Sequence, residues 1–257
     1  MYGGPQTISG SIIHILCRYP ILVVPIALGL IFGIPNLSQV AEDSLPSSMI
    51  TFAFDDGYFS TYEKAFPILE KYTFPATVFV ISSVIGEPGH MTAEQILELA
   101  DKGWEIGSHT ETHSDLTQLT DEQLKHELVN SKQHLEELGL IVKNFASPYG
   151  KYDERVIKMI AKYYDSHRTA WPDGLNDLPL DNLNRYYLKS VSVEARTTIE
   201  EVKEWVIKAK NEGKWLILLF HRIDETGDYN WTSRDFEEIV KFVHEEKFKG
   251  VSIKEMR

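Results

Sequence analysis

Four short polar motifs in this sequence combine residue types that can hydrolyse a bond with the help of a metal ion. They are Asp55–Gly57 (DDG), Ser108–His113 (SHTETH), Ala146–Gly150 (ASPYG) and Leu218–His221 (LLFH). Two adjacent carboxylates after an apolar run repel each other unless a cation or hydrogen-bond donors hold them. An isolated Asp-Asp-Gly is otherwise typical of a simple turn. The first motif therefore indicates chemistry only if partners for its carboxylates lie elsewhere in the chain.

His109 and His113 are candidate partners for these carboxylates. Histidines four residues apart on one helical turn lie on the same face and can bind one metal ion. With nine histidines in 257 residues, such a pair also arises by chance, so the site needs a third ligand. One of the paired aspartates is the natural donor. An Asp with two His leaves a coordination position open for water, as in catalytic metal sites.

The other two motifs also follow strand-like runs. Residues 147–150 (SPYG) form a stiff turn that could expose backbone N–H groups and an aromatic wall, or they could be a plain loop. His221 follows a continuously apolar run, where a histidine can act in proton transfer or simply cap the end of the sheet. Taken together, the four motifs describe a metal, a base, an acid and an oxyanion pocket.

An alternation of strands and helices must position these motifs. We expect strands at residues 49–54, 76–82, 104–108, 142–146, 166–171, 187–193, 215–220 and 251–253. We expect helices at about 61–71, 153–163 and 234–246, and helices with capping-box spacing that begin at Thr92, Thr120 and Thr198. Seven or eight strand–helix pairs predict an α/β fold, as a parallel sheet or a barrel. In such folds the active site gathers at the carboxyl ends of the strands, where all four motifs lie.

Length, charge and cysteine content narrow the class of protein. The chain has 26 basic and 38 acidic residues, so its net charge is −12 at pH 7. A surface this acidic repels phosphate backbones, and we expect no nucleic-acid partner. An apolar content of 43% excludes wholesale disorder, and α/β barrels reach this length as one domain. Cys17 is the only cysteine, which excludes an internal disulfide and a thiolate-based metal site.

The amino-terminal segment has a different composition. Residues 20–35 carry no charge, Arg18 precedes them, and small polar residues follow. This order is typical of a secretory signal or an uncleaved anchor, although the run is short for a spanning helix. We expect residues 1–46 to be a signal or membrane anchor, with attachment through residues 12–35, and residues 47–257 to be the catalytic domain. The protein would then be extracytoplasmic, either secreted or anchored. The alternative is a hydrophobic arm that packs on the domain or on a partner.

The motifs resemble those of a known family. TFAFDDG (51–57), HTETH (109–113), SPYG (147–150) and LLFH (218–221) are similar to the motifs of polysaccharide deacetylases, carbohydrate esterase family 4 with its NodB-homology domain. The resemblance covers nearly the whole chain from Ser48. It implies a distorted (β/α)7-type barrel of parallel strands with outer helices. It also implies metal-dependent hydrolysis of N-acetyl groups on an N-acetylated polysaccharide or oligosaccharide, with release of acetate.

The resemblance also implies a role for each matching residue. Asp55 would be the general base and His221 the general acid, while the Tyr149 backbone N–H would face the oxyanion. The implied ligands of a divalent metal, commonly Zn²⁺ with Co²⁺, Ni²⁺ or Mn²⁺ as alternatives, are Asp56, His109 and His113. The implied substrate-binding residues are Pro148, Tyr149 and Leu218, the last in the pocket for the acetyl methyl group.

The sequence departs from the family pattern at one catalytic position. The family usually has an arginine two residues before the proline of the third motif, where it holds the catalytic aspartate, but here that residue is Ala146. We hypothesise that a cation from another strand end replaces it, with Arg168 as the first candidate and Arg185 and Arg222 next. The alternative is that Arg168 is a solvent-facing strand residue. Residues 171–173 (WPD) match the family's Asp-x-x-Asp-Trp segment only loosely.

Other functions remain open at this point. The same metal site could serve an acetyl ester or a non-sugar amide. A protein of another class, a carbohydrate-binding domain that has lost catalysis along with the arginine, would not need the complete acid–base–metal set. The aromatic side chains that could stack on sugars are Tyr149, Trp171, Tyr229 and Trp231. Only Tyr149 belongs to a motif, so we expect packing roles for the other three.

Overall fold

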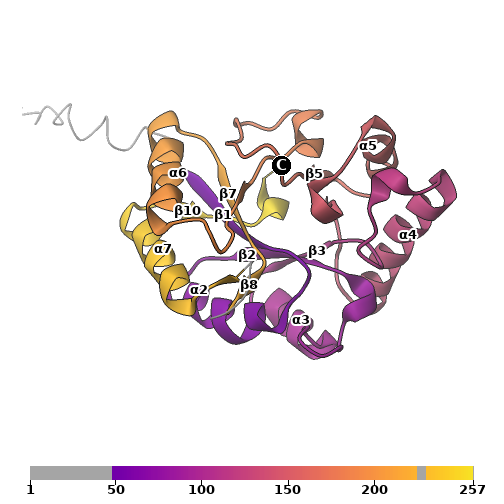
Figure 1. Cartoon of the computed structure of the whole chain (residues 1–257), viewed down its shortest axis with the longest axis horizontal. Coiled ribbons are helices and arrows are strands. Elements are labelled where there is room, and N and C mark those ends of the chain that lie inside the picture. The colour runs from indigo at the N-terminus through magenta and orange to yellow at the C-terminus, as the bar shows by residue number, and fades with distance from the viewer. Residues whose placement is uncertain (1–47, 225–229, 257) are drawn as a thin grey trace, which may run out of the picture. The chain divides into compact units, whose positions relative to one another are not determined.

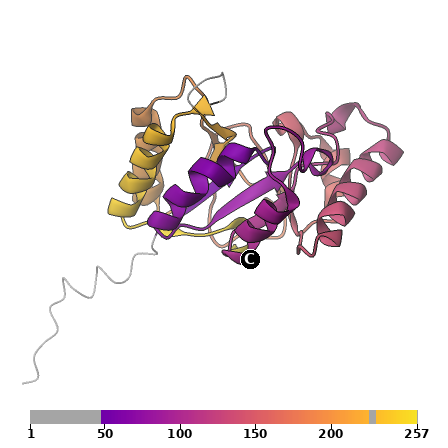
Figure 2. The same cartoon turned by 90° about the horizontal axis from the view of Figure 1, so that it is seen from below.

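The structure is a computed structural model that describes residues 48–224 and 230–256. Within these ranges, eight strands form one sheet that curls into a distorted barrel with helices on its outer side (Figures 1 and 2). The strand order is β5-β4-β3-β2-β1-β7-β6, with β10 beside β1, and all of these pairs are parallel. The expected α/β barrel is therefore confirmed.

The sheet is built from short buried strands. They are β1 (Met49–Phe54), β2 (Ala76–Val80), β3 (Glu105–Ser108), β4 (Asn144–Ala146), β5 (Ser166–Arg168), β6 (Val191–Ser192), β7 (Leu216–Phe220) and β10 (Lys249–Gly250). A separate pair consists of β8 (Arg222–Ile223) and β9 (Asn230–Trp231). The last strand of the sheet lies earlier than the 251–253 expected from sequence. Ser252 and Glu255 form a capping box there, and this box turns the chain into a 3₁₀ turn from Ile253.

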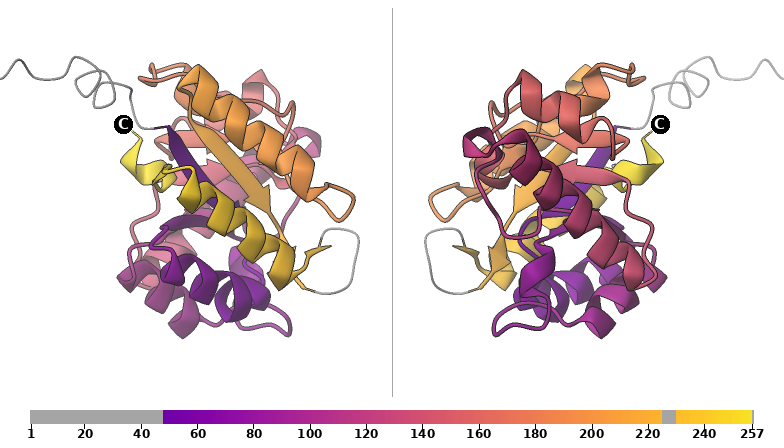
Figure 3. Two further views of the ribbon diagram at one scale, coloured as in Figure 1. Left: turned by 90° about the vertical axis from the view of Figure 1, so that its left-hand side faces the viewer. Right: turned by 90° about the vertical axis from the view of Figure 1, so that its right-hand side faces the viewer.

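The helices begin where the sequence predicts. They are α2 (Phe66–Lys71), α3 (Ala93–Asp101), α4 (Asp121–Glu137), α5 (Glu154–Ile160), α6 (Ile199–Glu212) and α7 (Ser233–Glu245). A π-helical turn at Thr61–Ala65 leads into α2. Capping boxes at Thr92, Thr120 and Thr198 are present, each with reciprocal side-chain and backbone bonds. Figure 3 shows α6 and α7 side by side, and ion pairs such as Lys203–Glu238 link them.

Alternate residues of each strand face two different cores. One set packs between the sheet and the helices, and the other fills the barrel interior. The interior is tight around Phe79, because a Cβ atom on Gly107 would lie 2.6 Å from that ring. Polar residues lie above and below this apolar middle, at the carboxyl and amino ends of the strands. The upper polar layer holds Asp55, His109 and Arg168.

The barrel is distorted where its edges meet. Strands β5 and β6 do not pair directly. Instead Leu188, just before β6, donates its N–H to His167 O (3.1 Å) and accepts from Thr169 N (2.8 Å). This bridge holds the end of β5 over the barrel interior, with Arg168 paired to Leu188.

The expected amino-terminal signal or anchor, residues 1–46 with the attachment segment 12–35, lies outside the described residues. The boundary at residue 47 therefore stays a prediction. Among the helices that the structure describes, none is long and apolar enough to cross a membrane.

Candidate active site

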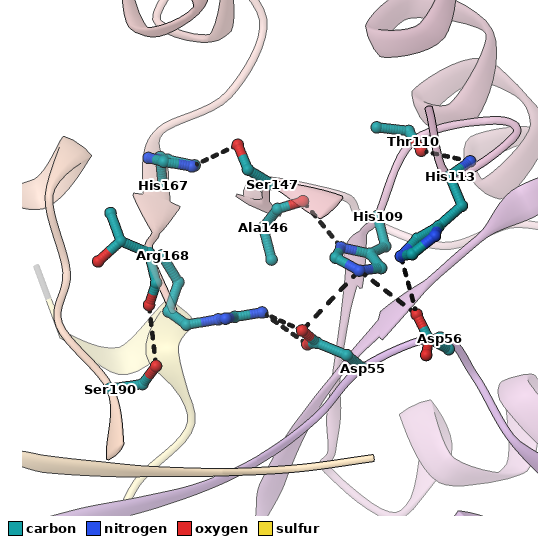
Figure 4. A network of polar contacts seen from close by, with 11 residues as sticks. Asp55, Asp56, His109, Thr110, His113, Ala146, Ser147, His167, Arg168 and Ser190 are labelled. Carbon is teal, nitrogen blue, oxygen red and sulfur yellow. Dashed lines mark hydrogen bonds and ion pairs between the residues drawn. The ribbon is translucent and has the colours of Figure 1, made fainter. Parts of the chain in front are cut away.

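The three predicted metal ligands meet at the carboxyl ends of β1 and β3 (Figure 4). His109 Nε2 lies 3.4 Å from Asp56 Oδ1, and His113 Nε2 lies 3.3 Å from the same oxygen. One ligand atom from each residue lies within 4.8 Å of the other two. This spacing is short enough for all three atoms to bind a single ion.

The backbone that presents the two histidines is not helical, which corrects the expectation of one helical turn. Residues 109–113 form an irregular loop, with Thr110 at φ 71° and His113 at φ 63°. The Thr110 hydroxyl accepts the His113 N–H at 2.9 Å. The imidazoles still converge, with ring centroids 5.0 Å apart, because the left-handed residues turn the loop back on itself.

The chemistry of these atoms fits a cation. His109 Nδ1 lies 2.8 Å from Ala146 O, which can only accept, so Nδ1 carries the proton and Nε2 presents a lone pair. That lone pair faces Asp56 Oδ1, a buried oxygen without a hydrogen-bond partner among the described residues. Burial lowers the pKa of His109 to about 3 and also lowers that of His113, so both imidazoles are neutral ligands. Two facing acceptors without a proton between them are stabilised by a divalent ion.

Arg168 lies directly against Asp55. Its Nη2 is 2.6 Å from Asp55 Oδ1 and 2.5 Å from Oδ2, and both side chains are buried. The sheet register pairs Ala146 with Arg168, so the guanidinium comes from the strand beside the position where the family arginine is missing. Arg168 is fully buried and lies 5.1 Å from the Phe79 ring. It is therefore not the solvent-facing residue of the alternative interpretation.

The two aspartates differ in their pKa values. Burial raises the pKa of Asp55, but the charge of Arg168 and its hydrogen bond outweigh burial, and the net pKa is lowered. Burial and the charge of Asp55 raise the pKa of Asp56 to about 6. Arg168 thus keeps Asp55 ionised at neutral pH. Asp55 N donates to Phe220 O (3.0 Å), so His221 follows at the carboxyl end of β7, next to the end of β1 that carries Asp55.

The third motif forms a wall next to the histidines. Tyr149 has φ 58°, is 58% exposed, and its ring lies 4.6 Å from the His113 ring. Pro148 is buried below it. The turn is held by Ser147, whose Oγ lies 2.8 Å from His167 Nε2. Because His167 Nδ1 donates to Tyr186 O (2.9 Å), Nε2 accepts and the Ser147 hydroxyl donates.

The prediction for Leu218 is wrong by one residue. Leu218 belongs to the outer core with Phe220, on the face of β7 that the helices cover. Leu219 belongs to the barrel interior, and strand alternation places it on the same face as His221. The motif LLFH contains two adjacent leucines, and the count from the histidine decides between them.

The remaining candidates lie apart from the base and the metal ligands. Arg222 lies over the Tyr58 ring at 5.0 Å and 3.7 Å from Asp224. Arg185 lies in the 3₁₀ turn at Asn184–Tyr186. Asp173 accepts the Ser192 N–H at 3.2 Å.

Two of the three extra aromatic residues can be placed. Trp231 is buried and donates its indole N–H to Thr197 O (3.2 Å), as expected for packing. Trp171 is 49% exposed, against the expected packing role. Tyr229 lies outside the described residues.

Three residues near the site carry no sequence motif. Tyr58 hydrogen-bonds to Asp56, and burial together with that carboxylate raises its pKa to about 12. His167 supports Ser147, and Glu127 binds the loop between the two histidines. Tyr58 directly follows the DDG motif, and this position was a sequence signal for it. The roles of His167 and Glu127 can be recognised only from tertiary contacts.

Comparison with known proteins agrees with this geometry. A family model described as polysaccharide deacetylase matches residues 42–164, which contain the first three motifs. Over this range the chain is similar to the polysaccharide deacetylases. The matched range ends before Arg168 and His221, so the fold supplies the evidence that these two residues join the same site.

Three relatives show how far this family resemblance extends. YxkH of Bacillus subtilis (strain 168), assigned to the polysaccharide deacetylases, is 37% identical over 126 residues, 48% of this chain and 45% of its own length. The poly-beta-1,6-N-acetyl-D-glucosamine N-deacetylase of Staphylococcus aureus (strain COL) is 25% identical over 200 residues, 72% of this chain and 63% of its own.

The third relative is a solved structure, a polysaccharide deacetylase from Bacillus cereus. It is 28% identical with a TM-score of 0.54, and the match covers 60% of this chain and 50% of that one. The chain therefore spans less than two thirds of the length of each of these three relatives.

Proposed function

We propose that this protein is a polysaccharide deacetylase, a metal-dependent hydrolase that removes N-acetyl groups from an N-acetylated glycan and releases acetate. The observation that carries the proposal is Asp56 Oδ1, which faces two neutral imidazoles next to the Arg168–Asp55 pair. This arrangement supports a metal site with a base beside it. A domain that only binds carbohydrate has no use for a buried, ionised carboxylate at this place.

Asp56, His109 and His113 would hold the metal. Zn²⁺ suits one carboxylate and two imidazoles, and Co²⁺, Ni²⁺ and Mn²⁺ are the alternatives. A divalent ion held there would polarise a carbonyl and lower the pKa of a water molecule towards about 7. Tyr58 hydrogen-bonds to Asp56 and would fix the orientation of that carboxylate.

Asp55 and His221 would move the protons. Arg168 keeps Asp55 ionised, so the carboxylate can accept a proton from the attacking water. His221 would donate a proton to the amide nitrogen as the C–N bond breaks, and the products are acetate and a free amine. One water proton goes to Asp55, and the other leaves the acetic acid product to give acetate. The proton on Asp55 returns through solvent to His221, which gave its own to the nitrogen.

Residues of the third and fourth motifs would bind the acetamido group. The left-handed backbone of Tyr149 would direct its N–H to the oxyanion, and the loss of one such donor typically costs about 3 kcal/mol. Pro148 and Tyr149 would line the groove. We propose Leu219 for the acetyl-methyl pocket, because it shares the face of β7 that carries His221.

The substrate and location form the finer part of the proposal. The Staphylococcus aureus relative is named for poly-beta-1,6-N-acetyl-D-glucosamine, so oligomers of that glycan are the first substrates to test. The apolar run at residues 20–35 supports action outside the cytoplasm, secreted or anchored, on a cell-wall or surface glycan.

Acetate release measures the proposed activity directly. Metal-stripped protein is supplied with Zn²⁺, Co²⁺, Ni²⁺ or Mn²⁺ and incubated with β-1,6-linked N-acetylglucosamine oligomers, chito-oligosaccharides, peptidoglycan fragments or acetylated xylan. We expect metal-dependent acetate from an N-acetylated glycan, and none from the matched His113→Ala variant. Acetate from xylan alone would identify an esterase. Glycan binding without metal or turnover would identify a binding domain.

A further inference from the structure

The loop that carries the two histidines has an unfavourable backbone. Thr110 (φ 71°) and His113 (φ 63°) both lie in the left-handed region. This conformation costs a residue with a side chain about 1–2 kcal/mol, and it is rarer still for a β-branched residue such as threonine. Such a conformation persists only where surrounding contacts impose it. The loop therefore requires an anchor.

Glu127 on α4 provides three contacts to this loop. Its Oε2 accepts the N–H of Glu111 at 3.0 Å and the N–H of Thr112 at 2.9 Å. Its Oε1 accepts the Thr112 hydroxyl at 2.5 Å. The side chain is buried, so these charged hydrogen bonds form with little competition from water. One carboxylate thus satisfies both backbone donors at the tip of the loop.

The opposite side of the loop is held by backbone contacts alone. Ser82 N donates to Thr110 O at 3.1 Å, and Ser83 N donates to Glu111 O at 3.0 Å. The loop carbonyls are therefore fixed by the segment after β2, while its N–H groups are fixed by α4. Of these two sets of contacts, the set to α4 is made by the Glu127 side chain, so a substitution at Glu127 can remove it.

We propose that Glu127 is a positioning residue that holds residues 110–113 in place, so that His113 Nε2 faces Asp56 Oδ1 before a metal binds. The inference rests on the metal site of the proposed function, not on the identity of the substrate. A loop ordered during folding spends no further conformational entropy when the ion binds. Glu127 therefore raises metal affinity without contacting the metal.

Metal affinity of three variants tests this role. Zn²⁺ binding is measured by competition with a chromophoric chelator. Glu127→Ala removes all three contacts, and we expect about 10- to 100-fold weaker binding, as for other residues that orient metal ligands. Glu127→Gln keeps an oxygen that can accept both N–H groups, so it should recover most of the affinity. The matched control is Asn130→Ala on the same helix. Asn130 contacts the side chains of Glu111 (3.3 Å) and His126 (2.9 Å) and not the backbone N–H groups of the loop, so this variant should bind Zn²⁺ normally.

Several outcomes would overturn the proposal. A folded Glu127→Ala variant with normal Zn²⁺ affinity excludes the anchor. A Gln variant as weak as the Ala variant assigns the effect to charge instead of position. If the Ala variant does not fold, amide exchange of the metal-free wild type decides. Slow exchange at Glu111 and Thr112 supports the anchor, and exchange as fast as in open loops refutes it. Tight Zn²⁺ binding without acetate release would count against the deacetylase, not against Glu127.

Discussion

Carboxylates are buried at both ends of the barrel interior. Among the described residues, only the carboxyl ends of the strands hold a buried carboxylate oxygen without a hydrogen-bond partner. At the carboxyl ends of the strands lie Asp55 and Asp56, and at the amino ends lies Glu105, the first residue of β3. The apolar middle layer between them includes Ala53 and Phe79. The two ends share a sheet, a burial depth and a residue chemistry, so their differences arise from local partners.

The lower end is fully satisfied. Glu105 accepts from Thr77 Oγ1 (3.0 Å), from Lys254 N (2.6 Å) and from Asn144 Nδ2. Asn144 in turn accepts from Ser166 Oγ at 2.7 Å. Each polar side-chain atom of this cluster has a protein partner within the described residues. Such a network closes the bottom of the barrel and leaves no atom for a ligand.

The upper end is incomplete. Asp56 Oδ1, Arg168 Nε and Arg168 Nη1 are buried without hydrogen-bond partners in the described part of the chain. An unmet buried group costs about 1–3 kcal/mol, which a structural cluster would avoid. The comparison shows that a buried carboxylate alone does not mark a site. A site is indicated instead by a buried carboxylate, such as Asp56, with an oxygen that lacks a hydrogen-bond partner in the described part of the chain.

Asp55→Asn should have the largest effect on this comparison. The amide cannot accept a proton from water, so we expect acetate release to fall about 10³-fold. The change also leaves the Arg168 charge without its partner, so turnover is expressed per folded, metal-loaded molecule, from circular dichroism and metal analysis. Glu105→Ala is the matched change at the lower end and should keep its turnover. Equal losses in both variants would remove the functional distinction between the ends.

Arg168→Met should have the next largest effect. Without the guanidinium, burial is left to raise the pKa of Asp55, and the base loses its orientation. We expect turnover to fall about 10²-fold with Zn²⁺ content retained. An unchanged rate at full metal content would discard Arg168 from the site.

The register between β4 and β5 sharpens this test. Ala146 pairs with Arg168, so the double variant Ala146→Arg/Arg168→Ala returns an arginine to the position implied by the family resemblance. Recovery of turnover above that of Arg168→Ala alone shows that Asp55 needs the charge and not a particular strand. No recovery would mean that the approach from β5 is itself required.

The sequence predicted the upper end better than the lower end for physical reasons. Strand–helix alternation and T-x-x-E/Q spacing are local signals, and they placed the helices α3, α4 and α6 correctly. The ligands Asp56, His109 and His113 lie in contiguous motifs whose order is readable in one chain. The loop geometry was missed, because left-handed Thr110 is imposed by tertiary contacts and not by propensity.

The contacts that are hardest to predict join residues far apart in the sequence. Glu105 and Lys254 are 149 residues apart, and Asp55 and Arg168 are 113 apart. Arg168 was nominated from a missing residue at 146, which is an inference from an absence. No missing family residue pointed to Glu127 or His167 in the same way. Leu218 was chosen over Leu219 because strand phase cannot be fixed from a uniformly apolar run.

Glu105→Ala should lower stability and leave chemistry unchanged. The change leaves three buried donors, from Thr77, Asn144 and Lys254, without their acceptor. We expect the free energy of unfolding to fall by about 2–4 kcal/mol, measured by urea denaturation. A loss below about 0.5 kcal/mol would show that water satisfies these donors and that the lower layer is open like the upper one.

Thr77→Val should have the smallest effect, and its size should depend on pH. Burial raises the pKa of Glu105 above its ordinary 4.5, while the donors Lys254 N, Asn144 and Thr77 and the charge of Lys254 oppose that shift. Removing the Thr77 hydroxyl raises the pKa further. A carboxyl with a raised folded-state pKa contributes stability that is present below pH 4.5 and lost as pH rises through the folded pKa. We expect a loss of about 1 kcal/mol at pH 7 and a smaller one at pH 4.

Thr51→Val is the matched control for the pH dependence. Thr51 is equally buried, donates to Val251 O (2.7 Å) and accepts from Trp215 Nε1 (3.0 Å), and neither partner titrates. Its cost in urea denaturation should therefore be the same at pH 4 and pH 7. If the Thr77 and Thr51 variants lose stability in parallel at both pH values, Glu105 is not ionised in the folded protein. The lower end would then be a neutral network. The two ends would differ in charge, because Asp55 is ionised, as well as in whether their carboxylates have hydrogen-bond partners.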